Sequence, residues 1–472
     1  MSHVVTDNSP NLPRWSWLSV AIAALLAFEL AHIFIGHATL RYLAWTSGLA
    51  FVVFAMPRTG LRERALVGIC AAMAVWLVLR HQGEVLARAV DQAVFLASFI
   101  QILGLLREAA ITSQAIRACG LHLTRQPPQR RYLAIHAGSH LFGMILNFGA
   151  ISLLAPLIQE GVKASDGDER VKAIRERRQL SAMIRGFSWI VVWAPSSVTQ
   201  ALLISLFPGA DHVRAVTLGV VTAAVMMVLG WLEDRFRYRR TAPRPPVAVS
   251  ALAPRTLHHL AGIVAMLLAL VFIIRLSSNV GIVPSLMLAA PIALSIWVFV
   301  QNGALGPARG LLAVGQRWRH VVLVGLPAGV REGVMLGASG FIGVVAGALT
   351  PADEIAALLG RNQIDPALFL MALPILIILA GQIALSPVMM VVFLGSVISA
   401  FPTPPADHAL VAFALASGWG LTMTAAPNAT GSLMLSRITG IPSTVLTWRW
   451  NGPFTLLALG WLAIVFVVLT RS

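Results

Sequence analysis

The sequence predicts an all-α polytopic membrane protein with about 11 transmembrane helices in two inverted repeats, each holding a re-entrant hairpin and a broken helix. Three observations predict this fold. Apolar residues make up 57% of the 472 residues and charged residues only 11%, whereas soluble proteins are roughly 25% charged. Lys and Arg gather in a few short segments between apolar runs, as in cytoplasmic loops. Two apolar segments, 133–158 and 366–401, fit hairpins better than single spans.

Composition also excludes several classes of protein. The net charge of +16 could indicate a nucleic-acid binder, but the basic residues are those of cytoplasmic loops, so the expected partner is the lipid bilayer. The two cysteines, Cys70 and Cys119, support neither a disulfide framework nor a metal site. The membrane segments contain no HExxH motif, no GxSxG motif and no paired carboxylates. We therefore expect no enzyme, no catalytic residue, no bound metal and no cofactor.

The distribution of arginine predicts the topology of the first half. With the N-terminus in the cytoplasm, residues 1–36 form an extra helix and 37–232 form the first repeat. Its basic segments 107–131 and 159–179 flank the apolar segment 133–158. If that segment crossed the membrane, the second basic block would lie outside, against the charge bias. We therefore expect a hairpin that turns at Asn147-Phe148-Gly149. The remaining spans are expected near 15–36, 39–56, 65–80, 92–106, 182–206 and 214–232.

The second half follows the same order in the opposite orientation. A linker rich in proline and arginine, 233–257, leads into the second repeat, 258–472. The apolar segment 366–401 is interrupted at Ser386-Pro387 and is followed by "PTPPADH", which has no Lys or Arg, so it is predicted to enter from the outer face. The C-terminus is then outside a cytoplasmic (inner) membrane. The other spans are expected near 258–275, 283–300, 321–348, 409–435 and 454–469.

The helix after each hairpin contains the same interruption. Segment 182–206 holds "WAPSSVT" and segment 409–435 holds "AAPNATGS". Proline removes a backbone donor, so each helix should kink or unwind there, which frees carbonyls for a cation and amide N–H groups for an anion. Such a kink can serve packing alone, but its occurrence after both hairpins favours a solute site. The candidate substrate-binding residues are Asn147, Gly149, Gln382, Ser386, Ser196, Ser197, Thr199, Asn428, Thr430 and Ser432.

Several titratable residues also lie at membrane depth. His136 and His140 are one helical turn apart, and they either relay a proton or form a structural hydrogen-bonded pair. Glu332 is a further proton candidate, and the coupling ion is either Na⁺ or H⁺. Arg331 either meets a substrate or forms a structural ion pair with another helix. Arg185 lies near a predicted helix end, where its head group can snorkel.

This layout resembles the ion transporter superfamily, which includes the divalent anion:sodium symporters and the arsenite permeases. In those symporters each hairpin tip carries Ser-Asn-Thr, which contacts a substrate carboxylate. Asn147 matches that asparagine, with Leu146 and Phe148 as its neighbours. Ser386 matches the serine, and Pro387 stands in place of the asparagine. The resemblance implies an elevator-type movement of the hairpins and broken helices, and a possible homodimer.

The predicted function is therefore secondary active transport, as in a symporter. The solute is a small anion, a carboxylate or an oxyanion, and its movement is coupled to an ion. The alternatives are a membrane-embedded enzyme acting on a lipid or lipid-linked substrate, and a channel. The segments 165–185 and 351–365 are either interfacial arms that hold the moving part or solvated loops.

Overall fold

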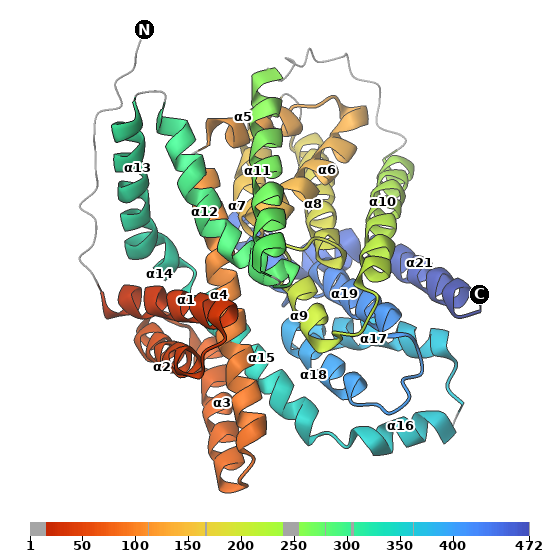
Figure 1. The fold of residues 1–472 in the computed structure, drawn as a ribbon. Coiled ribbons are helices and arrows are strands. Elements are labelled where there is room, and N and C mark those ends of the chain that lie inside the picture. Colours follow the sequence, from red (N-terminus) through yellow and green to blue (C-terminus); the bar gives the residue numbers. More distant parts are fainter. Residues whose placement is uncertain are drawn as a thin grey trace. The chain divides into compact units, whose positions relative to one another are not determined.

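The computed structural model describes residues 16–111, 113–165, 168–238, 254–278, 280–303, 306–361 and 363–471. Within these ranges every regular element is a helix (Figure 1). Nine helices of the described part are long and apolar enough to span a membrane. The prediction of an all-α polytopic membrane protein is confirmed. Most of the predicted linker 233–257 lies outside the described residues.

The chain divides into two compact units, and the first consists of Met1–Ile69, Ala93–Ala109 and Met266–Ala338. Its helices from the first half of the chain, wholly or in part, are α1 (Trp17–Ile35), α2 (Ala38–Ala55), η1 (Met56–Arg58), α3 (Leu61–Leu79) and α4 (Gly83–Ile111). Those from the second half are α11 (Pro254–Ser278), α12 (Ile282–Gly303), α13 (Pro307–His320), η3 (Val321–Gly325), α14 (Leu326–Ala328) and the start of α15 (Val330–Leu349).

The basic segment between the predicted spans 283–300 and 321–348 is helical rather than a plain loop. It forms α13, which runs antiparallel to α12. Gly310 packs against Phe299, and the indole Nε1 of Trp318 donates to Ser295 Oγ at 3.0 Å. Gly310 and Trp318 therefore hold α13 against α12, whereas Leu311 and Leu312 are 65% and 67% exposed.

The second unit consists of Cys70–Gln92, Ala110–Ala265 and Ser339–Ser472. From the first half it contains α5 (Gln114–Thr124), α6 (Pro128–Leu146), α7 (Gly149–Lys163), α8 (Glu169–Ser188), η2 (Trp189–Val192), α9 (Val198–Leu206) and α10 (His212–Arg237). From the second half it contains α16 (Ala352–Arg361), α17 (Pro366–Gln382), α18 (Pro387–Ser399), α19 (His408–Ala425), α20 (Thr430–Thr439), η4 (Val445–Asn451) and α21 (Gly452–Arg471).

The predicted arm 165–185 is not a separate element. Asp168 caps α8 by accepting from the N–H of Val171 at 2.8 Å, so this helix begins well before the predicted start at 182. Its second half, from Gln179 onward, is buried. The charges of its first turns obscured a helix that becomes apolar farther along. The segment 351–365 does contain a short separate helix, α16, which buries no residue.

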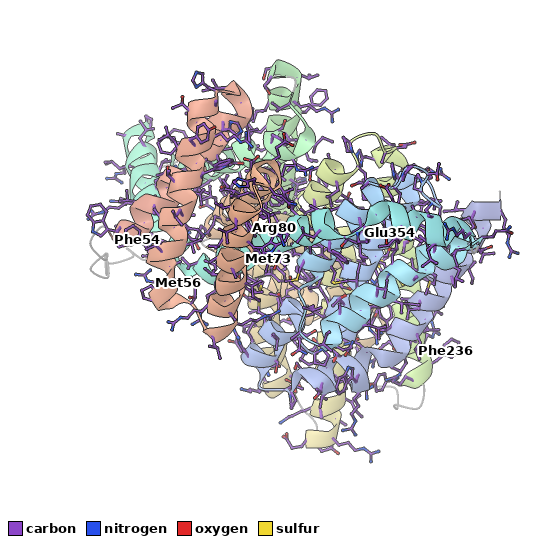
Figure 2. All side chains as sticks on the ribbon, turned by 90° about the horizontal axis from the view of Figure 1, so that it is seen from below. Phe54, Met56, Met73, Arg80, Phe236 and Glu354 are labelled. Atoms are coloured by element: carbon purple, nitrogen blue, oxygen red, sulfur yellow. The ribbon has the colours of Figure 1, made fainter. Side chains whose placement is uncertain are left out.

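Exposed apolar side chains on the long helices are consistent with contact with lipid. Phe54 on α2 is 40% exposed, and Phe236 near the end of α10 is 68% exposed (Figure 2). In water such a surface would be unfavourable, whereas the hydrocarbon core of a bilayer accommodates it. Among the candidate spans of the described residues, only the one that contains α19 has an apolar window buried throughout.

Candidate functional site

The first hairpin is formed by α6 and α7, which pack against each other. α6 ends at Leu146 and α7 begins at Gly149, so the chain turns where the sequence predicts. Asn147 has a φ of 51° and a ψ of −131°, a positive-φ conformation outside the αL well that L side chains rarely adopt. Asn147 thus forms the turn with its backbone and places a polar side chain at the hairpin tip.

α6 lies against α8 at very short range. Ser139 Oγ donates to the carbonyl oxygen of Met183 at 2.9 Å. A Cβ atom on Gly186 would stand only 2.2 Å from the carbonyl oxygen of His136. Glycine is therefore required where the hairpin meets the helix that follows it.

The first broken helix unwinds after η2. Residues 193–197 are not helical, and Pro195 lies at their centre, where it supplies no backbone donor. α9 then begins with Ser197 as its cap, because Ser197 Oγ accepts from the N–H of Gln200 at 3.2 Å. The N–H groups of the first turn of α9, which have no acceptor within the helix, therefore lie at the break.

The second half repeats this arrangement. α17 ends at Gln382 and α18 begins at Pro387, and Ala384 between them has a φ of 65°. α19 ends before residues 426–429, which are not helical and contain Pro427, and α20 follows. Each half thus contains a hairpin followed by a helix that is interrupted at an Ala-Pro pair.

Each hairpin is hydrogen-bonded to the break in the helix that follows it. Ser196 Oγ donates to the carbonyl oxygen of Met144, in the last turn of α6, at 2.6 Å. Asn428 Nδ2 donates to the carbonyl oxygen of Gln382, the last residue of α17, at 3.0 Å. A polar side chain one residue after the proline therefore holds a hairpin in both halves.

The two broken helices also contact each other within the second unit. A Cβ atom on Gly420 of α19 would stand 2.8 Å from the carbonyl oxygen of Ser188, at the end of α8. Gly431 of α20 lies beside Ile184 of α8 and Ile151 of α7. The second half therefore packs directly on the first, with small residues at the contacts.

Gln382, predicted to bind the substrate, makes hydrogen bonds to two other elements. Its Nε2 donates to the carbonyl oxygen of Ala425 at 3.2 Å, and its Oε1 accepts from the indole Nε1 of Trp448 at 3.0 Å. This side chain therefore links the second hairpin both to the break and to η4.

The other predicted polar residues differ in their bonding. Ser432 Oγ donates to the carbonyl oxygen of Met423 at 2.6 Å. Thr199 is fully buried, and its hydroxyl has no hydrogen-bond partner among the described residues. Ser386 is buried directly before α18. Three more stand at a hairpin tip or at the start of α20: Asn147, Gly149 and Thr430.

The two histidines of α6 have different surroundings. His140 Nδ1 lies 2.8 Å from the carbonyl oxygen of Gly186, and the indole Nε1 of Trp193 donates to His140 Nε2 at 2.8 Å. The rings of His140 and Trp193 are stacked with centroids 5.6 Å apart. His136 is buried beside the ring of Tyr132, and its Nδ1 has no hydrogen-bond partner among the described residues.

Arg331 and Glu332 lie in the first unit, at the start of α15. Arg331 Nε donates to the carbonyl oxygen of Arg58 at 3.0 Å, so its observed partner is a backbone group rather than the expected carboxylate. Arg107 of the same unit interacts electrostatically with Glu332. The bond made by Arg331 thus lies within that unit, and a proton role for Glu332 stays a prediction.

Arg185 carries a role that the sequence did not reveal. The expectation that it snorkels is wrong, because the residue is only 2% exposed. Its NH1 donates to Glu233 Oε2 at 2.9 Å, and its Nε donates to Asn451 Oδ1 at 2.7 Å. The guanidinium lies 4.4 Å from the ring centroid of Phe454. The side chain therefore joins α8 to α10, η4 and α21.

A second ion pair adjoins this one. Arg178 makes a two-pronged contact with Asp234, with Nε to Oδ1 at 3.0 Å and NH2 to Oδ2 at 2.6 Å. Arg237 NH2 lies 2.5 Å from Glu233 Oε1. The sequence signal for these ion pairs was the adjacent Glu233 and Asp234, the only acidic residues in an otherwise basic helix end.

Among the described residues, no group of three His, Cys, Asp or Glu side chains could hold a metal ion. A monovalent cation at the breaks would have to use backbone carbonyls and hydroxyls, and an anion could use the first N–H groups of α9 and α20.

The structure resembles the crystal structure of the YdaH transporter from Alcanivorax borkumensis, whose topology is described as unusual. The TM-score is 0.55 at 14% sequence identity, and the likeness covers 86% of this chain and 96% of that chain. The likeness therefore shows a shared fold over nearly the whole length. No protein-family model and no curated protein matches the sequence.

Proposed function

We propose that this protein is a secondary active transporter that moves a small anionic solute, a carboxylate or an oxyanion, by alternating access. The observation that carries the proposal is the hydrogen bond between each hairpin and the break that follows it. Ser196 and Asn428 make it at matching positions. Paired hairpins and broken helices place polar backbone groups at membrane depth, where secondary transporters bind their solutes. The fold shared with a transporter supports this function.

The division of the chain supports an elevator-type movement as part of the proposal. Both hairpins and both broken helices belong to the second unit. Their close contacts, such as that between Gly420 and Ser188, would keep them together if this unit moved. The proposed setting is the cytoplasmic membrane, with the N-terminus inside, the C-terminus outside and an ion gradient as the energy source.

Uptake into proteoliposomes tests the function. Succinate, phosphate and arsenite are offered with a sodium gradient, a proton gradient or neither, and accumulation against a concentration gradient is expected for at least one solute. Ser196→Ala and Asn428→Ala should each reduce uptake about fivefold, because each loses a hydrogen bond of about 1 kcal/mol. Ser205→Ala is the matched control, since its hydroxyl bonds only within α9. Equal losses in all three variants would contradict a role for the hairpin contacts.

Cysteine accessibility distinguishes a transporter from a membrane-embedded enzyme. Asn147→Cys and Ser386→Cys are introduced separately into a background that lacks Cys70 and Cys119. Labelling by an impermeant maleimide should change from one side to the other when the driving gradient is reversed. Labelling that stays constant under all gradients would contradict alternating access.

A further inference from the structure

The hydrogen-bond partners of His140 determine its protonation state in this conformation. The carbonyl oxygen of Gly186 can only accept, so Nδ1 carries a proton. The indole of Trp193 can only donate, so Nε2 is the acceptor and carries none. The imidazole is therefore neutral, with both nitrogens occupied.

A second proton on His140 is incompatible with this arrangement. It would occupy Nε2, and two N–H donors would then face each other across the 2.8 Å that now separates the two nitrogens. Trp193 would have to withdraw. Trp193 begins the unwound segment 193–197, which also carries the Ser196 contact to the first hairpin. A charge on the hairpin would thus alter the break itself.

The electrostatic surroundings do not supply a counter-ion for that charge. On α6 the neighbouring titratable groups are Tyr132 and His136, and α8 adds the cation Arg185. The carboxylates of α10, Glu233 and Asp234, already pair with three arginines. α5 and η2 face this part of α6 with Leu123 and Ile190, and the charged residues of α7, Glu160 and Lys163, lie in its last turn.

We propose that His140 is the binding site of the coupling proton, and that protonation releases Trp193 while an anionic solute bound near the first hairpin supplies the opposing charge. The proposal rests on the transport function proposed above. A solute anion and the proton would each favour binding of the other by the same factor, because linkage is reciprocal. Proton and anion would then move together, as in a symporter.

The release of Trp193 is tested without solute and again with succinate or phosphate present. Protein labelled with 5-fluorotryptophan is placed in lipid nanodiscs, and the fluorine resonance of Trp193 is assigned by its loss in Trp193→Phe. The resonance should shift as the pH is lowered from about 8 to about 4, and succinate or phosphate should move the midpoint to higher pH, because the buried imidazole lacks a counter-ion until an anion binds. The shift should persist in the control His136→Gln and vanish in His140→Gln, whose amide oxygen can still accept from the indole. A resonance that does not titrate, or one that titrates equally in His140→Gln, would overturn the proposal.

Coupling is tested in proteoliposomes with succinate and phosphate as probes. For one proton per solute, an inward gradient of one pH unit should raise accumulation about tenfold. His136→Gln should keep this response, whereas His140→Gln and Trp193→Phe should lose it and still exchange solute across the membrane. Uptake whose pH response survives in His140→Gln would refute the proton site but not transport. Failure of the wild type to move any probe would refute transport, and the fluorine titration would still show whether protonation of His140 releases Trp193.

Discussion

Removing the carboxylate opposite Arg185 tests the buried ion pair that joins α8 to α10. Glu233→Gln keeps the shape of the side chain but leaves a guanidinium that is 2% exposed without its charged partner. Breaking a buried pair in this way lowers the free energy of unfolding by about 3–5 kcal/mol. Arg214→Gln is the matched control. Its pair with Asp407 is closer, at 2.7 Å against 2.9 Å. Each side chain is 42% exposed, however, so its loss should cost about 1 kcal/mol or less.

The assay is equilibrium unfolding in mixed micelles with increasing sodium dodecyl sulfate, followed by circular dichroism. A double variant, Arg185→Met with Glu233→Gln, removes the unpaired charge as well. It should recover at least half of the loss, because apolar replacement of a buried pair is often close to neutral. The reasoning is refuted if Glu233→Gln is no less stable than Arg214→Gln, or if the double variant is no more stable than the single one.

Two further predictions concern close packing and a buried thiol. Gly186→Ala should lower the free energy of unfolding by about 1–3 kcal/mol, because its Cβ would overlap α6. Gly68→Ala is the control, since Gly68 has open space around it, and both variants are compared by thermal unfolding. Equal unfolding midpoints would contradict the packing argument. Burial raises the pKa of the Cys119 thiol above its usual range, so less of it is thiolate at any given pH. In a Cys70→Ser background its alkylation by iodoacetamide should be slower than that of glutathione and should still accelerate above about pH 9. A rate that levels off below that pH would contradict the shift.

The breaks in the helices were predictable because they depend on local chemistry. Proline cannot donate a hydrogen bond, so Pro195 and Pro427 interrupt their helices whatever surrounds them. The turn at Asn147 was likewise expected, because a glycine and an asparagine stand together in an apolar segment flanked by arginines. The charge bias that suggested a hairpin there depends only on counting residues along the chain.

The partners of the polar side chains were not predictable in the same way. Ser196 and Asn428 were expected to face a solute, yet in this conformation each donates to the backbone of a hairpin. Trp193 was not singled out at all, although it holds His140. No local pattern indicates which carbonyl or ring nitrogen a side chain will reach across two helices.

By itself the sequence determined that this protein is helical, where its helices break, and that it belongs in a membrane. Those properties follow from hydropathy, proline and charge, which act within a few residues of chain. Only the tertiary structure decided that Arg185 is buried and paired with Glu233, that α8 begins at Glu169, and that each hairpin is bonded to the following break. These depend on groups that lie far apart in sequence, and their energies arise only when packing excludes water from the contact.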